Sequence, residues 1–276
     1  MSGASISDVR DQYEAGEPLS MLTAYDAEMA RLVEAGGVDM ILVGDSAADN
    51  HHGYADTLSL TLEEALSNTA AVVRGVDNTP VIADLPFLSY GTSTEVSISN
   101  AGRFLKEAGA DAVKLETAPG GDATIALIDR LTELGIPVQG HIGFTPQHIR
   151  QLGGAVIQGR DADASTSEST LVDTAERLVE VGVFSIVLET VTESAARAVT
   201  DAIDVPTIGI GAGRYVDGQV LVLNDVIGLG SPEYTLAKAY ANVGDEIEDA
   251  VETYVEDVRT GAFPTAEQTF DPIDKR

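Results

Sequence analysis

A repeated alternation between two kinds of segment constrains the fold of this sequence more than any other feature. Eight short runs rich in apolar and β-branched residues recur along the chain, and each is followed by polar or small residues and then by a segment with helical periodicity. The runs are Met21–Ala24, Met40–Val43, Val81–Ala83, Ala112–Leu115, Pro137–Gly140, Ser185–Leu188, Thr207–Ile210 and Val220–Leu223. Strands that alternate with helices form a parallel sheet, because each helix returns the chain to the edge where the next strand begins.

The intervening segments place apolar residues on one face of a helix. The candidate helices include Ala27–Ala35, Leu62–Arg74, Thr94–Ala108, Ala123–Leu134, Ser169–Val181 and Ser194–Ala202. Gly109, Gly135 and Gly182 follow three of them, where a helix end requires left-handed backbone. Such a sheet is either open and doubly wound or closed, and eight units without a marked second domain favour closure. We therefore predict an α/β fold, a (β/α)8 TIM barrel, with residues 1–276 as a single domain.

Three segments fall outside this repeat. Residues 1–18 are expected to form a short capping helix that closes the bottom of the barrel. The Ser- and Asp-rich stretch Asp161–Thr170 indicates a mobile acidic loop, and Tyr234–Ala262 indicates a C-terminal helical extension of one or more amphipathic helices. The residues from Pro264 onward are expected to be irregular.

The charge balance of the chain is strongly acidic. There are 45 acidic and 16 basic residues, and the formal net charge is −29. A surface of this sign repels the phosphates of nucleic acids, so we expect no nucleic-acid partner. Because the acidic residues are scattered over helix faces and loops, we interpret the charge as adaptation to high salt.

Two absences limit the chemistry and the location. Cysteine is absent, which leaves oxygen and imidazole groups as metal ligands and favours Mg²⁺ or Mn²⁺ over softer ions. No apolar run approaches the roughly 20 residues that cross a bilayer, and the N-terminus is polar, so we expect a cytoplasmic protein without membrane contact.

Four carboxylates stand at or just after the ends of predicted strands. They are Asp45, Asp84, Glu116 and Glu189. Each alone is explained equally well by a helix cap or a salt bridge, but a barrel brings the carboxyl ends of its strands to one mouth. Four negative charges there repel one another unless a cation neutralises them. A hard divalent ion such as Mg²⁺, with positions open to the oxygens of a 2-oxo acid, is the economical hypothesis.

A lysine and a histidine lie in the same predicted positions. Lys114 interrupts an apolar run in a chain with only four lysines, and it either pairs with Glu116 on the same strand face or reacts. His141 ends the fifth run and is a general acid, a metal ligand or a buried structural histidine. The pattern alone leaves these roles open.

Other candidate residues favour structural roles. His51 and His52 lie in a polar loop and are expected to face solvent, although they can border the mouth, and His148 is expected to begin a helix. The stretch Gly209–Gly213 follows the seventh run, whereas a dinucleotide-binding pattern is expected near a first strand. We interpret it as a tight turn that lets backbone approach the site, with a phosphate cradle as the secondary reading.

Several blocks of this sequence, in order and spacing, resemble the ketopantoate hydroxymethyltransferase family. They are Thr23-Ala24-Tyr25-Asp26, Val43-Gly44-Asp45-Ser46, Ala83-Asp84-Leu85-Pro86-Phe87, Val113-Lys114-Leu115-Glu116, Gly140-His141-Ile142-Gly143-Phe144-Thr145-Pro146-Gln147, Val156-Ile157-Gln158-Gly159-Arg160, Leu188-Glu189, Ile208-Gly209-Ile210-Gly211-Ala212-Gly213 and Asp217-Gly218-Gln219-Val220-Leu221. The likeness runs from about residue 21 to about residue 264.

The resemblance implies a barrel of the phosphoenolpyruvate/pyruvate superfamily, usually assembled as a homodecamer. It further implies transfer of a hydroxymethyl group from 5,10-methylenetetrahydrofolate to 3-methyl-2-oxobutanoate, in pantothenate and coenzyme A biosynthesis.

The resemblance also implies residue roles. Asp45 and Asp84 bind Mg²⁺, with Glu116 as a further or water-mediated ligand. Glu189 is the proton acceptor. The substrate-binding residues are Asp45, Ser46, Asp84, Lys114 and His141, the last with a less defined role.

The sequence departs from the family pattern at three places. Residues 47–52 are more polar than the apolar stretch typical of the family, Thr117-Ala118 replaces a glycine pair, and Thr192 stands where a proline is common. All three flank the predicted mouth, so they bear on loop shape and folate contacts, whereas the metal-site residues match.

Two other functions remain open from the sequence. One is a metal-free aldolase in which Lys114 forms a Schiff base with a carbonyl substrate. The other is a non-catalytic barrel that binds the metal and the oxo acid without removing a proton. Borohydride trapping and exchange at C3 distinguish them from a metal-dependent enzyme.

Overall fold

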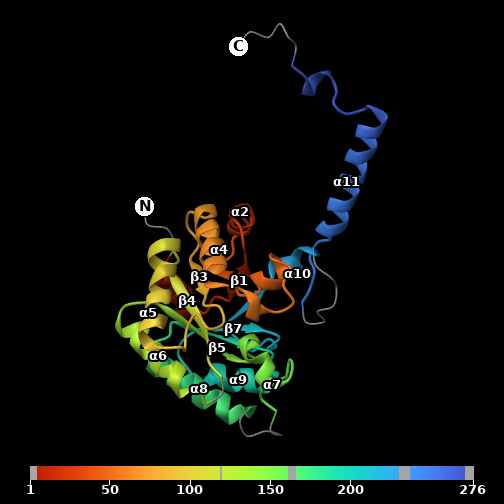
Figure 1. Ribbon diagram of the computed structural model, residues 1–276. Helices are drawn as coiled ribbons and strands as arrows, with labels where there is room; N and C mark the ends of the chain where they lie inside the picture. Colours follow the sequence, from red (N-terminus) through yellow and green to blue (C-terminus); the bar gives the residue numbers. More distant parts are fainter. Residues whose placement is uncertain (1–4, 119, 161–165, 230–236, 271–276) are drawn as a thin grey trace. The chain divides into compact units, whose positions relative to one another are not determined.

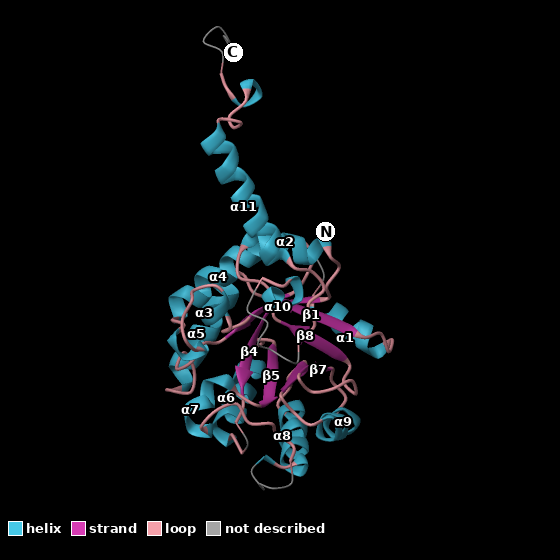
Figure 2. Cartoon of the chain, turned by 90° about the vertical axis from the view of Figure 1, so that its right-hand side faces the viewer, coloured by secondary structure: helices cyan, strands magenta, loops and turns pink. Residues whose placement is uncertain are grey.

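The computed structural model describes residues 5–118, 120–160, 166–229 and 237–270. Eight parallel strands close into a barrel in which each strand pairs with its sequence neighbours and β8 pairs with β1, with helices outside the strands (Figures 1 and 2). The strands are β1 (Leu19–Thr23), β2 (Met40–Val43), β3 (Val81–Asp84), β4 (Ala112–Glu116), β5 (Val138–Gly143), β6 (Ser185–Glu189), β7 (Thr207–Ile210) and β8 (Gly218–Leu221). The predicted barrel is confirmed.

Two hydrophobic cores follow from the alternation of side chains along the strands. One fills the barrel, and its members include Met21, Met40 and Ile82. The other lies between strands and helices and includes Val113 and Leu115. Because successive side chains point to opposite faces, the residues that alternate with this outer row point into the barrel.

The helices that connect the strands agree closely with the sequence pattern. They are α2 (Ala27–Ala35), α4 (Leu62–Gly75), α5 (Thr94–Arg103), α6 (Asp122–Glu133), α8 (Glu168–Glu180) and α9 (Glu193–Ala202). A five-residue π-helical turn, Phe104–Ala108, extends α5. Thr61 begins α4 with a capping box to Glu64, which satisfies backbone donors at that end. Gly109, Gly135 and Gly182 have the expected positive φ.

The structure corrects two expectations. Every strand was expected to lead into a helical segment, but residues 211–217 join β7 to β8 without one. Gly211 and Gly213, both at positive φ, turn the chain there, in agreement with the predicted tight turn. The expected loop Asp161–Thr170 is too long, because α8 already begins at Glu168, and residues 161–165 lie outside the described part.

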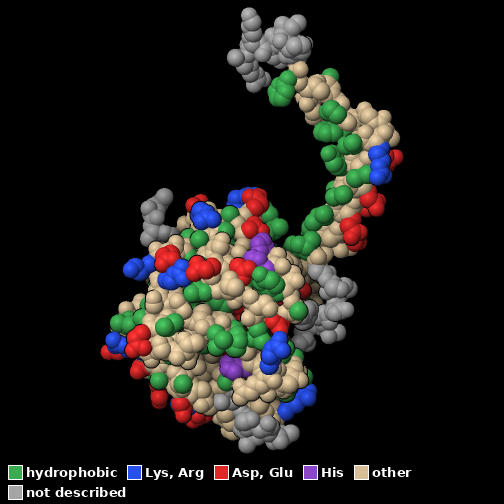
Figure 3. Space-filling model, in the orientation of Figure 1, with side chains coloured by type: hydrophobic (Ala, Val, Ile, Leu, Met, Phe, Trp, Pro, Cys, Tyr) green, Lys and Arg blue, Asp and Glu red, His purple; other side chains and the backbone are tan. Residues whose placement is uncertain are grey.

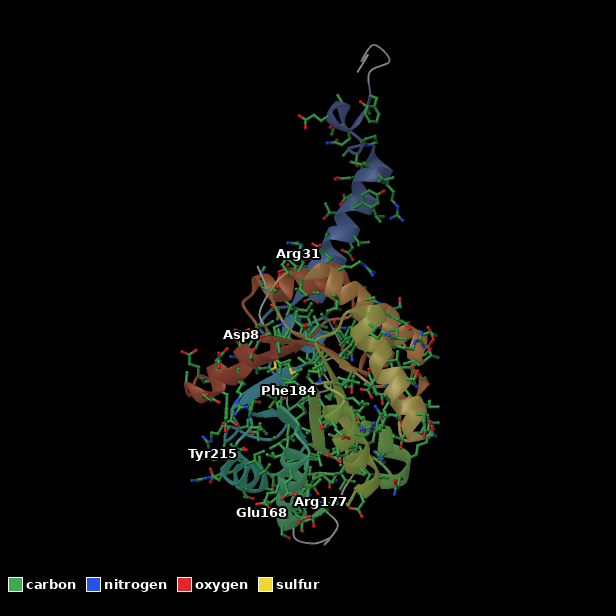
Figure 4. The ribbon with its side chains drawn as sticks, turned by 90° about the vertical axis from the view of Figure 1, so that its left-hand side faces the viewer. Asp8, Arg31, Glu168, Arg177, Phe184 and Tyr215 are labelled. Carbon is green, nitrogen blue, oxygen red and sulfur yellow. The ribbon has the colours of Figure 1, made fainter. Side chains whose placement is uncertain are left out.

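A short N-terminal helix, α1 (Ile6–Glu14), contacts the N-terminal side of the barrel. Its buried Val9 belongs to the core that fills the barrel, together with Leu19 at the beginning of β1. Phe184, just before β6, packs against the same core (Figure 4). These contacts close the barrel at the end opposite the strand C-termini.

Short helices follow several of the strands. They are α3 (Ala47–Asn50), η1 (Thr57–Ser59), η3 (Pro146–His148), α7 (Ile149–Leu152) and α10 (Leu223–Ile227). His148 ends η3 and immediately precedes α7, so the expectation that a helix begins there is close to what is observed. Arg150 of α7 pairs with Asp56 beside η1, at 3.1 Å, and so links the loops after β5 and β2.

The chain divides into two compact units, residues 1–223 and 224–276. The barrel lies in the first, and the single-domain assignment for 1–276 stays a prediction. The second contains the predicted C-terminal helix, α11 (Val243–Thr260), and a 3-10 turn, η5 (Ala266–Gln268), where only irregular chain was expected. Within the described residues no helix has the length and apolar character needed to span a membrane.

Helix α11 is amphipathic, as predicted. Its exposed apolar residues recur at intervals of four, three and four, which places them on one face of the helix. They are Ile247, Val251, Tyr254 and Val258, with between 48% and 57% of each residue exposed. Hydrophobic side chains lie along this helix in Figure 3.

Candidate active site

Polar side chains from five consecutive strand ends meet at the C-terminal mouth of the barrel. They are Asp45 after β2, Asp84 on β3, Lys114 and Glu116 on β4, His141 on β5 and Glu189 on β6. All but Glu189 are at most 6% exposed. Those on strands lie on the inward rows, as the alternation of Ala112, Lys114 and Glu116 along β4 illustrates. The structure therefore brings the sequence-predicted residues into one site.

Lys114 forms a buried ion pair with Asp84. The distance from Lys114 Nζ to Asp84 Oδ2 is 2.8 Å, and the side chains are 5% and 2% exposed. The partner expected from sequence, Glu116, is not the one observed, because the register places Asp84 opposite Lys114 on the neighbouring strand. Burial alone lowers the pKa of Lys114, but the charges of Asp84, Asp45 and Glu116 outweigh it and raise that pKa above its ordinary value. Lys114 is therefore an ammonium at neutral pH.

His141 lies between this ammonium and Glu189. Its Nδ1 is 3.2 Å from Lys114 Nζ, and its Nε2 is 3.3 Å from Glu189 Oε2, although the second pair is not aligned as a hydrogen bond. Burial, and then the charge of Lys114, lower the pKa of His141 to about 3, so its ring is neutral. A lysine ammonium only donates, so Nδ1 accepts and the ring proton is on Nε2, facing Glu189.

Glu189 is the most accessible carboxylate of the site, with 22% of its side chain exposed at the mouth. The surrounding protein removes most of its hydration, and this burial raises its pKa to about 7, against the opposing effect of Lys114. The next residue, Thr190, has a φ of 52°, an uncommon conformation for a residue other than glycine. The chain thus turns sharply as soon as Glu189 has been presented.

The pKa values of the other three carboxylates are also raised above their ordinary values. Burial, followed by the nearby charge of Asp84, raises the pKa of Asp45 to about 7. Burial raises the pKa of Asp84 to about 6 despite Lys114, and burial raises the pKa of Glu116. Several carboxylates in one dry site ionise together only if a cation compensates them.

Each of these three carboxylates has one oxygen held by the protein, and in two of them the other oxygen has no donor among the described residues. Asp45 Oδ2 accepts from Gln147 Nε2 at 3.0 Å, Asp84 Oδ2 pairs with Lys114, and Glu116 Oε2 accepts from the backbone N of Gln147 at 3.0 Å. Asp84 Oδ1 and Glu116 Oε1 are buried without any hydrogen-bond partner. A buried carboxylate oxygen without a donor is costly, and a bound cation removes that cost.

The donor set suits a hard divalent cation. Carboxylate oxygens are the ligands of Mg²⁺, and the orphaned oxygens of Asp84 and Glu116 are available to one. Within the described residues, however, no three Asp, Glu or His side chains form a complete ligand set as they stand. The side-chain amide of Gln147 and the ammonium of Lys114 lie among the carboxylates.

Ser46 stands at the edge of this cluster. It precedes α3, and its hydroxyl is 2.9 Å from that of Tyr25, which is buried. Beyond Tyr25 the side chains of His51 and His52 follow in the polar loop. His51 is exposed as expected, whereas His52 is half-buried beside Asn68, with 3.0 Å between its Nε2 and the amide nitrogen.

Sequence reasoning missed three residues of the site. Gln147 and Tyr90 are buried and hydrogen-bonded to each other at 3.0 Å, and His148 Nδ1 lies 3.7 Å from Glu116 Oε2. Gln147 and His148 follow Pro146 in the short helix η3, where nothing in the sequence spacing indicates the direction of a side chain. The sequence gives no signal for Tyr90 either. It lies six residues after β3, and its role depends on contacts with residues that are distant along the chain.

Solved structures with this fold include enzymes of small organic acids. A 2,3-dimethylmalate lyase of the PEP mutase/isocitrate lyase superfamily aligns with a TM-score of 0.61, covering 99% of this chain and 93% of that one, at 17% identity. A phosphonopyruvate hydrolase in complex with oxalate and Mg²⁺ aligns with a TM-score of 0.62, covering 96% and 93%, at 14% identity. At such identities the likeness establishes the fold alone.

Sequence relatives identify the family. The 3-methyl-2-oxobutanoate hydroxymethyltransferase of Halobacterium salinarum is 48% identical, over 93% of this chain and 91% of that protein. The enzyme of the same name from Pseudothermotoga lettingae is also 48% identical, over 92% and 94%. The model of the ketopantoate hydroxymethyltransferase family matches residues 4–266. This chain belongs to the ketopantoate hydroxymethyltransferase family.

Proposed function

We propose that this protein transfers a hydroxymethyl group to 3-methyl-2-oxobutanoate and so forms ketopantoate, with 5,10-methylenetetrahydrofolate as the one-carbon donor and Mg²⁺ as cofactor. The names of the relatives support the acceptor and the reaction. The observation that carries the mechanism is the linked series Asp84, Lys114, His141 and Glu189, which joins a carboxylate cluster to an accessible base.

Asp45, Asp84 and Glu116 are the residues that would hold the cation. Asp84 and Glu116 each have a buried oxygen with no donor among the described residues, and Gln147 holds Oδ2 of Asp45. When bound, Mg²⁺ supplies positive charge that stabilises an oxyanion on the oxo acid. The complex of a structural neighbour with oxalate and Mg²⁺ supports this pairing of a divalent ion with a small dicarbonyl acid.

Glu189 is the base in this proposal. The C3 hydrogen of the oxo acid is weakly acidic, so its removal needs both a base and a place for the resulting negative charge. A pKa of about 7 makes Glu189 more basic than an ordinary glutamate while it remains largely ionised just above neutrality. Lys114 places a permanent positive charge beside the cluster, where it favours the charged product of deprotonation. The carbanionic C3 then forms a bond to the one-carbon unit of the donor. Water supplies the oxygen of the new hydroxymethyl group, and tetrahydrofolate leaves as both of its C–N bonds to that carbon break.

His141 and Ser46 are assigned to substrate binding. The neutral His141 presents its Nε2 hydrogen toward Glu189 and the mouth, where it donates to an oxygen or orients the base. Ser46 follows Asp45 at the edge of the cluster, and its hydroxyl contacts Tyr25. Asp45, Asp84 and Lys114 are the other residues assigned to substrate binding.

The Schiff-base alternative is disfavoured by the state of Lys114. An imine forms only from a neutral amine, whereas the surrounding carboxylates keep Lys114 protonated. Lys114 also contacts Asp84 and His141. These contacts support an electrostatic role for this lysine.

The experiment that tests the proposed function measures ketopantoate formation from 3-methyl-2-oxobutanoate and 5,10-methylenetetrahydrofolate. We expect product with Mg²⁺, none with excess EDTA, and recovery when Mg²⁺ is restored. Borohydride with the oxo acid should leave Lys114 unmodified, as judged by mass spectrometry. Product formation in EDTA, or a reduced adduct on Lys114, would favour the metal-free aldolase instead.

We further propose a cytoplasmic homo-oligomer, with the decamer typical of the family. The exposed apolar face of α11 supports self-association, since an apolar stripe on a helix is unfavourable in water. Light scattering should give a mass near ten subunits, and the change Val251→Glu should lower it. A monomer mass for the unaltered protein would contradict the assembly.

A further inference from the structure

Gln147 links strands that lie far apart in the sequence. Its side-chain Nε2 donates to Asp45 Oδ2 at 3.0 Å and to the carbonyl of Leu85 at 2.9 Å. Its backbone N donates to Glu116 Oε2 at 3.0 Å. Asp45 follows β2, Leu85 follows β3, and Glu116 ends β4. One residue of the loop after β5 thus fixes groups from three other strands.

Tyr90 fixes Gln147 in turn. The Tyr90 hydroxyl is 3.0 Å from Gln147 Oε1, and the backbone N of Glu116 donates to the same hydroxyl at 3.3 Å. Gln147 is 5% exposed and Tyr90 is 9% exposed, so both act in the dry interior. Because the carbonyl oxygen of the Gln147 side chain accepts from Tyr90, the orientation of the amide is fixed, and its NH₂ faces Asp45.

These contacts determine which carboxylate oxygens remain for a cation. Gln147 occupies Oδ2 of Asp45 and Oε2 of Glu116, and it leaves Glu116 Oε1 without a partner. A carboxylate that receives a hydrogen bond on one oxygen is fixed in rotation and presents the other in a defined direction. Gln147 also lowers the repulsion between the two acids by placing N–H dipoles between them.

We infer that Gln147, held by Tyr90, is a positioning residue for divalent-cation binding, because it fixes Asp45 and Glu116 from strands on which it does not lie. This inference rests on the proposed function, since it takes those carboxylates as the cation site. On this inference, the affinity of the site for the cation depends on a neutral amide that does not itself contact the cation.

The test is the dissociation constant for Mg²⁺ alone, measured by isothermal titration calorimetry on the full chain, with the unfolding midpoint recorded for every variant in EDTA. Gln147→Met keeps the length of the side chain and removes the donor and the acceptor. We expect its Mg²⁺ dissociation constant to rise about 10- to 100-fold, the usual cost of losing a partner of a metal ligand. Saturating Mg²⁺ should then restore most of the turnover.

A matched control is available in Gln158→Met. Gln158 is 1% exposed, and within the described part of the chain its side-chain amide donates to the carbonyl of Val156 alone, at 3.1 Å. The Gln158→Met change removes a hydrogen bond of a buried glutamine and leaves the contacts of the carboxylates in place. We expect a similar change in the unfolding midpoint and a Mg²⁺ dissociation constant within about twofold of the unaltered protein.

Tyr90→Phe tests the hydrogen bond behind the amide. It should weaken Mg²⁺ binding several-fold, and the free-energy cost of Tyr90→Phe should be smaller in the Gln147→Met background, because the two residues act through one contact. Fully additive costs would contradict the coupling.

The two levels of the proposal fail differently. If the unaltered protein and Asp84→Ala bind Mg²⁺ equally, or neither binds it, the cation site itself is wrong. If the unaltered protein binds Mg²⁺, Asp84→Ala does not, and Gln147→Met matches the unaltered protein within twofold, the role of Gln147 is wrong while the site stands.

Discussion

At the scale of the residue, the chemistry depends on how burial divides similar side chains into different roles. Asp84 and Glu189 are both carboxylates with raised pKa values, yet Asp84 is paired with an ammonium and Glu189 keeps access to the mouth. His141 is neutral because burial, and then the charge of the same ammonium, lower its pKa. In the proposed mechanism, these environments suit Asp84 to compensate charge and Glu189 to accept a proton.

The raised pKa of Glu189 predicts the pH dependence of proton abstraction. Only the ionised form accepts a proton, so the rate of C3 exchange in D₂O should fall as the pH drops below about 7 and level off above it. Below that pKa the rate should drop about tenfold per pH unit, as expected for one titrating base. Initial exchange rates followed by NMR between pH 5 and 9 check this.

Glu189→Gln is the control for that profile. The amide keeps the shape of the side chain and cannot accept the proton, so exchange should fall by about 100-fold or more, within the usual range for a general base. A rate that is flat from pH 5 to 8, or a variant that exchanges like the unaltered protein, would remove Glu189 from this role.

Some of these residues could be predicted from the sequence, and others could not. Asp45, Asp84, Glu116 and Glu189 were identifiable because they end strand-like runs, and a barrel brings strand ends together. The pairing of Lys114 with Asp84 depends on strand register, which spacing within one strand does not reveal. Gln147 lies 102 residues from the Asp45 that it contacts, so only the closed barrel brings them together.

At the scale of the element, the accuracy of prediction follows the strength of the periodic signal. Helix α2 has the predicted bounds, and the other five predicted helices agree within one or two residues apart from the π-helical end of α5. The prediction for the link between β7 and β8 was wrong. The alternation elsewhere in the chain suggested a helix there, whereas turns at two glycines connect these strands. Strand β5 runs on to Gly143, three residues beyond its predicted end, through pairing with β6.

Gly143 provides a test of that pairing. It has a φ of +99° and lies opposite Glu189 in the register, and an added Cβ would lie 2.6 Å from Val191 Cγ2 and even closer to the backbone oxygen of Glu189. Gly143→Ala should therefore lower the free energy of unfolding by about 3 kcal/mol or prevent folding, because strain and a backbone clash combine. Urea unfolding checks this.

Gly102→Ala is the matched control. Gly102 lies in α5, where an added Cβ meets nothing within 4 Å. The change should raise the free energy of unfolding by about 0.5–1 kcal/mol through the helix preference of alanine. Equal stability of the two alanine variants would contradict the strained conformation assigned to Gly143.

At the scale of the whole molecule, the large net negative charge is the feature that bears most on stability. A net charge of −29 on 276 residues creates self-repulsion that opposes the compact state, and salt screens it over a distance of about 10 Å at 0.1 M and about 3 Å at 1 M. The fold class and the family were accessible from sequence, whereas the response to salt is a property of the full charge distribution.

The charge predicts stabilisation by salt. With excess Mg²⁺ held constant, the melting temperature should rise by about 5 °C or more between 0.1 and 2 M KCl, which corresponds to roughly 2 kcal/mol for a chain of this size. NaCl at equal ionic strength should act similarly if screening is the cause. Scanning calorimetry measures the change, and a melting temperature that is independent of KCl would rule out adaptation to high salt.

In the proposed mechanism, acids from separate strands hold a cation that binds the oxo acid, and Glu189 removes the C3 proton of that acid. The most direct measurement follows the C3 proton of 3-methyl-2-oxobutanoate by NMR in D₂O, with the protein in high KCl and without any one-carbon donor. The account predicts exchange with Mg²⁺, its loss in EDTA, its return with added Mg²⁺, and its absence in Asp84→Ala. Exchange that continues at the same rate in EDTA, or in Asp84→Ala, would contradict the account.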